Sequence, residues 1–213
     1  MRRRLIQISG FVSSTLGWVL VLCTVAMDSW KTTRIGNQGG SAMMTVLWYW
    51  SNLWKDCVTD ATSVSNCIDF PALWNVTYII NGVRGLLLTG LTLGLLGAIL
   101  CLVGMECTYI GGTDKAKNKL LLAGAVFHFV GDISAYALYI IYLFDIFLPF
   151  NSRYNVGPPI FVGFAACIFI FVGALLYAVT VFQVICPERY LNHLSSFLSG
   201  YQCYTALLTL SMF

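Results

Sequence analysis

Four long apolar stretches constrain the fold of this chain more than any other feature of its sequence. They cover residues 5–27, 85–105, 120–143 and 160–186, and Asp132 is the only Asp, Glu, Lys or Arg in any of them. A transmembrane helix needs about 20 consecutive, mostly apolar residues. Because a helix satisfies all of its own backbone polar groups in lipid, we predict a bundle of four transmembrane helices.

The overall composition agrees with a membrane protein and excludes several other classes. Hydrophobic residues make up 58% of the 213 residues and charged residues 10%, whereas soluble domains carry about 45–50% and about 25%. The net charge of +3 is too small and too dispersed for a nucleic-acid-binding protein. The sequence contains no H-E-x-x-H, G-x-S-x-G or P-loop motif, and His128 and His193 lie in separate regions. We therefore expect no enzyme activity, no cofactor and no metal site.

The basic residues predict the orientation of the helices, because Lys and Arg are enriched in short cytoplasmic segments. Seven of them lie close to span ends on one side: Arg2, Arg3, Arg4, Lys115, Lys117, Lys119 and Arg189. The other five are spread over residues 28–84 and 144–159. We expect both termini in the cytoplasm and these two loops outside the cell.

The long first loop contains two of the eight cysteines, Cys57 and Cys67. A lone pair in an oxidising compartment predicts one disulfide, with two free thiols as the alternative. Asn75-Val76-Thr77 is an N-glycosylation sequon. Its closeness to the second span leaves its occupancy open.

The stretch from Thr45 to Trp54 is rich in β-branched and aromatic residues. Trp48, Trp50 and Trp54 have the same parity, so a strand would place them on one face. The first loop is therefore predicted to form a small antiparallel sheet that the two cysteines hold together. The alternative is an aromatic belt at the lipid interface, which could account for Trp30 and Trp74.

The residues of this loop resemble the signature of the claudin family. The match consists of Trp30, the triplet Asn52-Leu53-Trp54, Cys57, Cys67, and Arg84 at the start of the second span. Two residues separate the triplet from the first cysteine, and nine separate the cysteines. The resemblance extends from about residue 10 to residue 186.

The resemblance implies an α+β membrane fold, in which a four-helix bundle carries a five-stranded extracellular antiparallel sheet. Claudins are tight-junction proteins that polymerise in cis, pair in trans across the cell gap, and either seal the paracellular path or form ion channels in it. In the cation-permeable members, an acid three residues after the first cysteine lines the pore. That position is Asp60 here.

We accordingly expect a tight-junction structural protein that forms a paracellular channel preferring small cations, with other claudins and the lipid bilayer as partners. Two alternatives stay open at this point. One is a barrier-forming adhesion claudin without a conducting pore. The other is an auxiliary subunit of an ion channel or receptor in a related four-span family.

Three further residues have expected roles near the membrane surfaces. Arg84 either extends to the lipid headgroups or, as the resemblance suggests, braces the sheet against the bundle. Cys107 and Cys186 lie just inside the membrane and are candidates for palmitoylation, with free thiols as the alternative.

The resemblance divides the chain into a four-span domain, residues 1–186, and an atypical apolar cytoplasmic tail, residues 187–213. The tail ends in Ser211-Met212-Phe213. This is a generic form of PDZ ligand that occurs often by chance, so binding to PDZ scaffold proteins stays open.

Two polar residues and three glycines stand out within the spans. His128 lies four residues before Asp132, on the same helical face, and an intramembrane carboxylate is costly. The two side chains either pair, or Asp132 is neutral at a polar contact between helices. Gly90, Gly94 and Gly97 form a small face that lets helices approach closely, within the bundle or in a dimer.

Overall fold

The computed structural model describes residues 2–35, 47–60, 62–70, 78–108, 112–147 and 154–185. Asn75, Cys186 and the tail 187–213 lie outside the described residues. The expectations for glycosylation, for palmitoylation of Cys186 and for PDZ binding therefore stay predictions.

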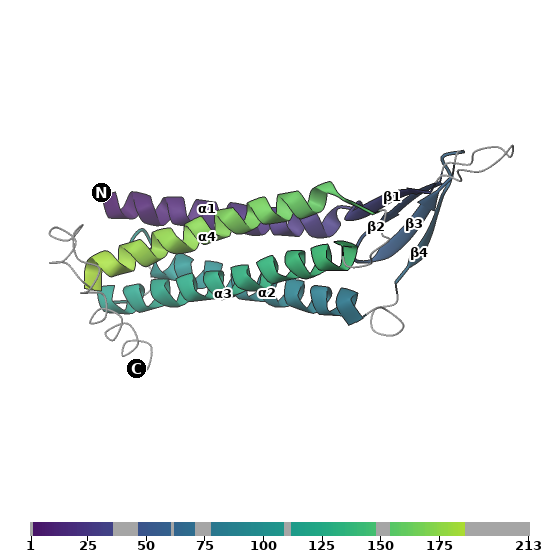
Figure 1. Ribbon diagram of the computed structural model, residues 1–213. Coiled ribbons are helices and arrows are strands. Elements are labelled where there is room, and N and C mark those ends of the chain that lie inside the picture. The colour runs from purple at the N-terminus through teal and green to yellow at the C-terminus, as the bar shows by residue number, and fades with distance from the viewer. Residues whose placement is uncertain are drawn as a thin grey trace, which may run out of the picture.

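Four long helices form the body of the structure: α1 (Arg2–Ala26), α2 (Tyr78–Gly104), α3 (Asp114–Phe147) and α4 (Pro158–Ile185). They run side by side along one long axis, with the strands beyond the end that is remote from the N-terminus (Figure 1). All four are long and apolar enough to cross a membrane. The predicted fold class of a four-helix membrane bundle with a small antiparallel sheet is confirmed.

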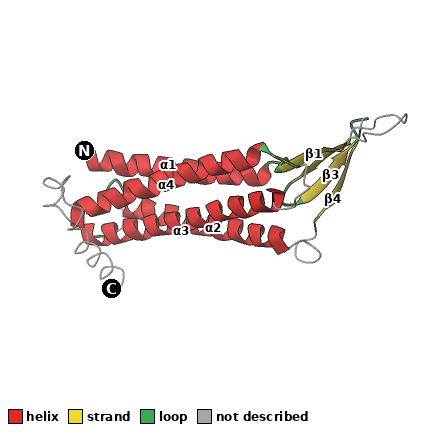
Figure 2. Ribbon diagram, viewed as in Figure 1, coloured by secondary structure: helices red, strands yellow, loops and turns green. Residues whose placement is uncertain are grey.

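The sheet is antiparallel and contains five strands in the order β4-β3-β2-β1-β5. Four of them come from the segment between α1 and α2: β1 (Lys31–Ile35), β2 (Leu47–Ser51), β3 (Lys55–Thr59) and β4 (Ser65–Asp69). The fifth, β5 (Asn155–Val156), precedes α4 and pairs with β1. All of the strands that the structure describes thus gather at one end of the bundle (Figure 2).

The prediction that three tryptophans share one face of a strand was wrong. Trp48 and Trp50 lie in β2, but that strand ends at Ser51 and Trp54 lies in the turn before β3. The Oδ1 atom of Asn52 accepts hydrogen bonds from the backbone N–H groups of Trp54, at 2.7 Å, and of the following lysine, at 2.8 Å. Asparagine side chains compete in this way with strand pairing and favour turns.

Trp30 fills the junction between the sheet and the bundle. Its side chain is fully buried, and its Nε1–H donates to the backbone carbonyl of Thr24 at 3.0 Å. The indole stacks on Tyr139, with ring centroids 5.8 Å apart, and meets Tyr142 edge-on at 5.2 Å. Trp30 is therefore a core residue, and a lipid-facing aromatic belt does not account for it.

The glycines of α2 leave room for the backbone of α3 and for a tryptophan ring of α1. A Cβ atom on Gly90 would lie 3.2 Å from the backbone oxygen of Gly131 in α3, and one on Gly94 would lie 2.3 Å from the Trp18 ring of α1. Of the two alternatives for this small face, the structure shows packing within the bundle.

His128 and Asp132 do not form the pair considered from their spacing. The Nδ1 atom of His128 instead accepts a hydrogen bond from Trp18 Nε1–H at 2.9 Å. The imidazole ring also stacks on the Tyr177 ring of α4, with ring centroids 6.1 Å apart. The partner comes from another helix, so the four-residue spacing within α3 gave no sign of it. Asp132 lies against Cys167 of α4, and the Cys167 thiol forms a hydrogen bond with its side chain. Of the two arrangements considered for Asp132, the structure therefore contains the polar contact between helices.

We expect Trp30→Ala to lower the free energy of unfolding by about 3–5 kcal/mol, because it empties a large buried site. Trp48→Ala is the matched control, since Trp48 is 43% exposed in the same sheet. Thermal unfolding of the purified protein in detergent, followed by circular dichroism, measures both. Equal losses in the two variants would contradict the assignment of Trp30 to the core.

Candidate functional site

The candidate functional site is the sheet, and a disulfide fixes its outer edge. Cys57 in β3 and Cys67 in β4 are direct partners in the strand register, and their sulfur atoms are bonded. The predicted disulfide is therefore present. All five residues of β4 are exposed, and β3 is the only strand beside it in the described sheet. The disulfide thus holds this edge strand in place.

Asp60 lies in the turn that connects β3 to β4. Its Oδ1 atom accepts hydrogen bonds from the backbone N–H of Thr62 at 2.9 Å, from the Thr62 hydroxyl at 2.5 Å and from the backbone N–H of Val64 at 3.2 Å. Ser63 next to them has a positive φ of 64°, a conformation that the side-chain bonds help to hold. Asp60 therefore shapes this turn as well as carrying a charge.

The environment of Asp60 keeps its carboxylate ionised. The hydrogen bond from the Thr62 side chain is the main cause that lowers the pKa of Asp60 below its ordinary value of 3.8. Among the described residues, the second oxygen, Oδ2, accepts no hydrogen bond, and the carboxylate forms no ion pair. The charge is thus available to mobile ions in the surrounding water.

Two cations of the sheet, Lys55 and Arg34, contact other residues. Lys55 Nζ lies 3.3 Å from Asp28 Oδ1 and 5.0 Å from the centre of the Trp50 ring. The Arg34 guanidinium stacks over the Trp48 ring at 4.3 Å. These positive groups are occupied by other parts of the sheet, so none of them neutralises Asp60.

A second acid of the sheet forms a hydrogen bond with the neighbouring strand β2. Asp56 in β3 forms a hydrogen bond with the Tyr49 hydroxyl, and burial together with this bond raises the pKa of Tyr49 above its ordinary value. Asp56 therefore contributes to the packing between the strands.

Arg84 connects α2 to the sheet. It lies inside α2, which begins at Tyr78, and its side chain is buried, with an exposed fraction of 7%. Its Nε and Nη2 atoms both donate to the backbone carbonyl of Leu53, at 2.9 and 2.6 Å. The guanidinium also lies 4.9 Å from the centre of the Trp54 ring. Of the two arrangements considered for Arg84, the structure contains the contact with the sheet.

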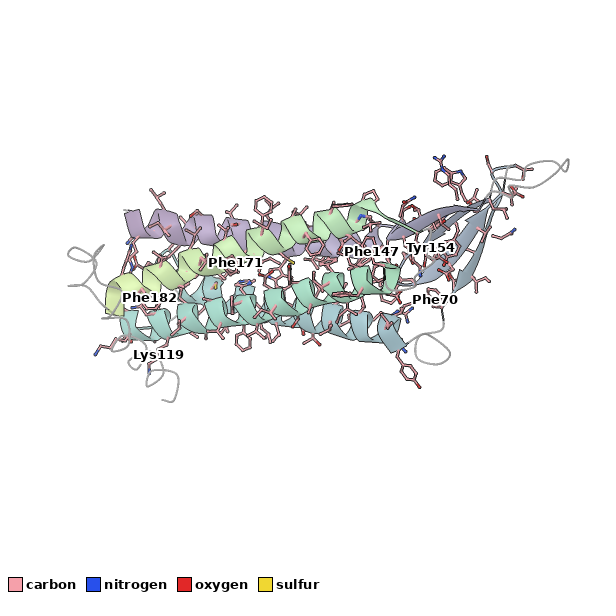
Figure 3. All side chains as sticks on the ribbon, viewed as in Figure 1. Phe70, Lys119, Phe147, Tyr154, Phe171 and Phe182 are labelled. Atoms are coloured by element: carbon pink, nitrogen blue, oxygen red, sulfur yellow. A yellow bond between two sulfur atoms is a disulfide. The ribbon has the colours of Figure 1, made fainter. Side chains whose placement is uncertain are left out.

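The signature residues meet at this junction. Leu53 is fully buried, next to Trp30 in the same core cluster. Asn52 shapes the turn and donates from Nδ2 to Asp28 Oδ1 at 3.0 Å. Figure 3 shows the same boundary at the labelled Phe70, Phe147 and Tyr154, with Lys119 and Phe182 at the opposite end of the bundle.

Thr62 is a site residue that the sequence reasoning missed. Its hydroxyl and backbone N–H both hold the Asp60 carboxylate. The order Asp60, then threonine and serine two and three residues later, is typical of an Asx turn. This signal was available in the sequence.

Cys107 lies away from the site. It follows the end of α2, on the side of the bundle opposite the sheet, and its thiol is free and exposed. Palmitoylation at this position stays a prediction. No group of three or more metal-binding side chains occurs among the residues that the structure describes.

The fold and the site define a four-span membrane protein with a disulfide-bonded sheet seated on one end of its bundle. A sequence model of the PMP-22/EMP/MP20/Claudin family matches residues 4–177. The chain therefore belongs to this family.

Individual claudins show the same relationship. The chain is 39% identical to claudin-10 of Homo sapiens over 82% of this chain and 78% of the relative. It is 30% identical to claudin-15 of Bos taurus, over 86% and 78%, and 29% identical to claudin-7 of Homo sapiens, over 80% and 83%. The resemblance to claudins inferred from the signature residues is confirmed, and the chain is a structural membrane protein and not an enzyme.

We expect Arg84→Met to lower the free energy of unfolding by about 1.5–3 kcal/mol, because it removes two charged hydrogen bonds and leaves the Leu53 carbonyl without these donors. Arg34→Met is the matched control, since Arg34 is exposed and also stacks on a tryptophan. Thermal unfolding and limited proteolysis of the sheet measure the effect. If Arg34→Met costs as much as Arg84→Met, Arg84 does not brace the sheet.

Proposed function

We propose that this claudin forms cation-preferring channels between cells, with the sheet as the part that meets neighbouring copies. In this proposal the protein polymerises in the plasma membrane at the tight junction and pairs with copies on the facing cell. The two paired surfaces leave a narrow aqueous path. Asp60 lines this path and attracts small cations, in the way that rings of carboxylates select ions in other channels.

The proposal places the sheet outside the cell and both termini in the cytoplasm. The distribution of positive charge supports this orientation. Arg3, Arg4, Lys117 and Lys119 belong to the bundle end opposite the sheet. Basic residues close to span ends are enriched on the cytoplasmic side. The disulfide supports the same orientation, because disulfides persist in oxidising compartments.

The observation that carries the ion preference is the carboxylate of Asp60 on an exposed turn, which forms no ion pair with any residue that the structure describes. Several charges nearby are engaged: Asp28 pairs with Lys55, Arg34 covers Trp48, and Arg84 is buried at the junction. Asp69 of β4 is also exposed and forms no ion pair among the described residues, so it is the acid against which Asp60 has to be compared. A charge that is free and exposed acts on passing ions, whereas paired charges largely cancel.

A barrier-forming claudin without a pore is the second candidate. The observation that favours it is the turn-forming role of Asp60, whose Oδ1 accepts three hydrogen bonds from Thr62 and Val64. In that case the carboxylate stabilises the turn and selects no ion. A substitution that keeps the turn but removes the charge distinguishes the two functions.

Asp60→Asn is that substitution, because the amide oxygen can accept the same hydrogen bonds. We expect it to lower the sodium-to-chloride permeability ratio severalfold, measured by dilution potentials in claudin-deficient epithelial cells that express the protein. Asp69→Asn, which removes an exposed acid of β4, is the control and should have a smaller effect. An unchanged ratio in Asp60→Asn would favour the barrier function.

The lowered pKa of Asp60 predicts the pH dependence of the channel. A carboxyl group with a depressed pKa stays ionised above its ordinary value, 3.8 here, and gains a proton only as the pH falls below it. The sodium preference should therefore be the same at about pH 7.4 and about pH 5. Loss of half the preference between these two values would show that a different group sets the selectivity.

A further inference from the structure

A groove on the outer face of the bundle lies between α3 and α4. It has a volume of about 450 Å³ and is lined by Phe129, Asp132 and Tyr136 of α3 and by Phe164, Cys167 and Phe171 of α4. Figure 3 shows the labelled Phe171 near the middle of the bundle's length. The aromatic walls are exposed, with exposed fractions of 44% for Phe129 and 51% for Tyr136. Apart from Asp132, the lining is apolar or weakly polar.

Asp132 gives this apolar groove one hydrogen-bonding group. Its side chain is 7% exposed, and its Oδ1 atom has no hydrogen-bond partner among the described residues. The thiol of Cys167 is a weak donor and does not form a hydrogen bond with this oxygen. A polar group without a partner inside a membrane is costly. Because the Oδ1 atom is itself buried, a donor from a docking helix reaches it, and stabilises the contact, when the side chains that line the groove move aside.

The packing of α2 against α3 shows which residues lie at the depth of Asp132. Gly90 contacts Gly131, and Gly97 contacts Gly124 and His128, in the two antiparallel helices. Extending this antiparallel register by one residue places Asp132 level with Thr89, and Thr92 lies almost one turn further along α2. Two copies that stand side by side in one membrane would therefore present Thr89 and Asp132 at the same depth.

The outer face of α2 is an unpartnered ridge that carries these hydroxyl donors. Thr89 and Thr92 are exposed, and the apolar residues beside them are exposed as well: Leu88, Leu95, Leu96, Ile99 and Leu102. The Thr92 hydroxyl already donates its one proton to the Thr89 carbonyl within the helix at 2.9 Å, so Thr89 supplies the hydroxyl donor that has no partner among the described residues. The ridge thus combines an apolar surface with threonine hydroxyls, and the groove combines an apolar surface with an acceptor.

We propose that the α2 ridge of one copy docks in the α3–α4 groove of the next copy in the same membrane, where the Thr89 hydroxyl donates to Asp132. The inference rests on the proposed function, because it supplies a lateral contact for the polymer. Ridge and groove are different surfaces of one molecule, so the contact is heterologous. Repeated contacts of this kind produce an open row of molecules instead of a closed dimer.

Cross-linking within single cells tests the contact without any junction. Leu95→Cys on the ridge is paired with Phe171→Cys on the groove wall, in differently tagged copies whose Cys23, Cys107, Cys186 and Cys203 are serine and whose Cys167, a free thiol in the groove, is alanine. Leu16→Cys replaces Phe171→Cys in the control. Leu16 is 45% exposed, close to the 42% of Phe171, and its neighbour Gly17 contacts Ile170 at a similar depth on another face. We expect oxidation by copper phenanthroline in sparse cells to join the first pair and not the second.

The hydrogen bond is tested by Thr89→Val combined with Thr92→Val, which removes both hydroxyls from exposed positions and keeps the side-chain shape. Hydrogen bonds between membrane helices have modest strength, so cross-linking should fall about three- to tenfold. Asp132→Asn keeps an acceptor and should retain the cross-link, whereas Asp132→Ala should lose it to the same extent as the threonine variant. Normal cross-linking in both the threonine variant and Asp132→Ala would overturn the assigned hydrogen bond.

Two other results would overturn the docking contact itself. One is equal cross-linking of the ridge with Phe171→Cys and with Leu16→Cys. The other is a Phe171→Cys variant that forms no cross-link and is labelled by a photoactivatable lipid. This result would show that a lipid occupies the groove. Dilution potentials from confluent layers of the same cells separate this inference from the proposed function. If the sodium preference is present but the cross-link is not, only the proposed contact is wrong. If the cross-link is present but the sodium preference is not, only the proposed channel function is wrong.

Discussion

The seating of the sheet on the helix bundle is the constraint on which the rest of this structure depends. Two buried side chains cross the boundary in opposite directions. Trp30 enters the bundle from the start of the sheet and packs on Tyr139 and Tyr142. Arg84 leaves α2 and donates twice to the Leu53 carbonyl of the sheet. An apolar contact and a pair of charged hydrogen bonds together fix the direction in which the sheet projects.

With this direction fixed, the far edge of the sheet becomes a defined surface. The disulfide between Cys57 and Cys67 ties β4 to β3, and the turn between these strands presents Asp60. The same carboxylate shapes the turn through one oxygen and leaves the other open to water. An ion-selecting surface needs a charge at a fixed position. A charge on a flexible loop would occupy many positions, and its attraction for an ion at any one point would be weaker.

The sequence predicted the parts of this structure that depend on local pattern. Long apolar stretches identified the helices, and the cysteine pair identified the disulfide. The position of Trp54 was missed because one side chain, Asn52, ends the strand before it. The partner of His128 was missed because it is Trp18, which a different helix supplies. Contacts between elements depend on how helices pack, and no spacing within one element encodes them.

The central claim is that the charge at position 60 faces the path that ions take between cells. Modification of a cysteine at this position tests it directly, in confluent cells that express Asp60→Cys. A membrane-impermeant thiol reagent that adds a negative charge should restore the sodium preference, and one that adds a positive charge should shift permeability toward chloride. If both reagents label the protein and neither changes the permeability ratio, position 60 does not line the path.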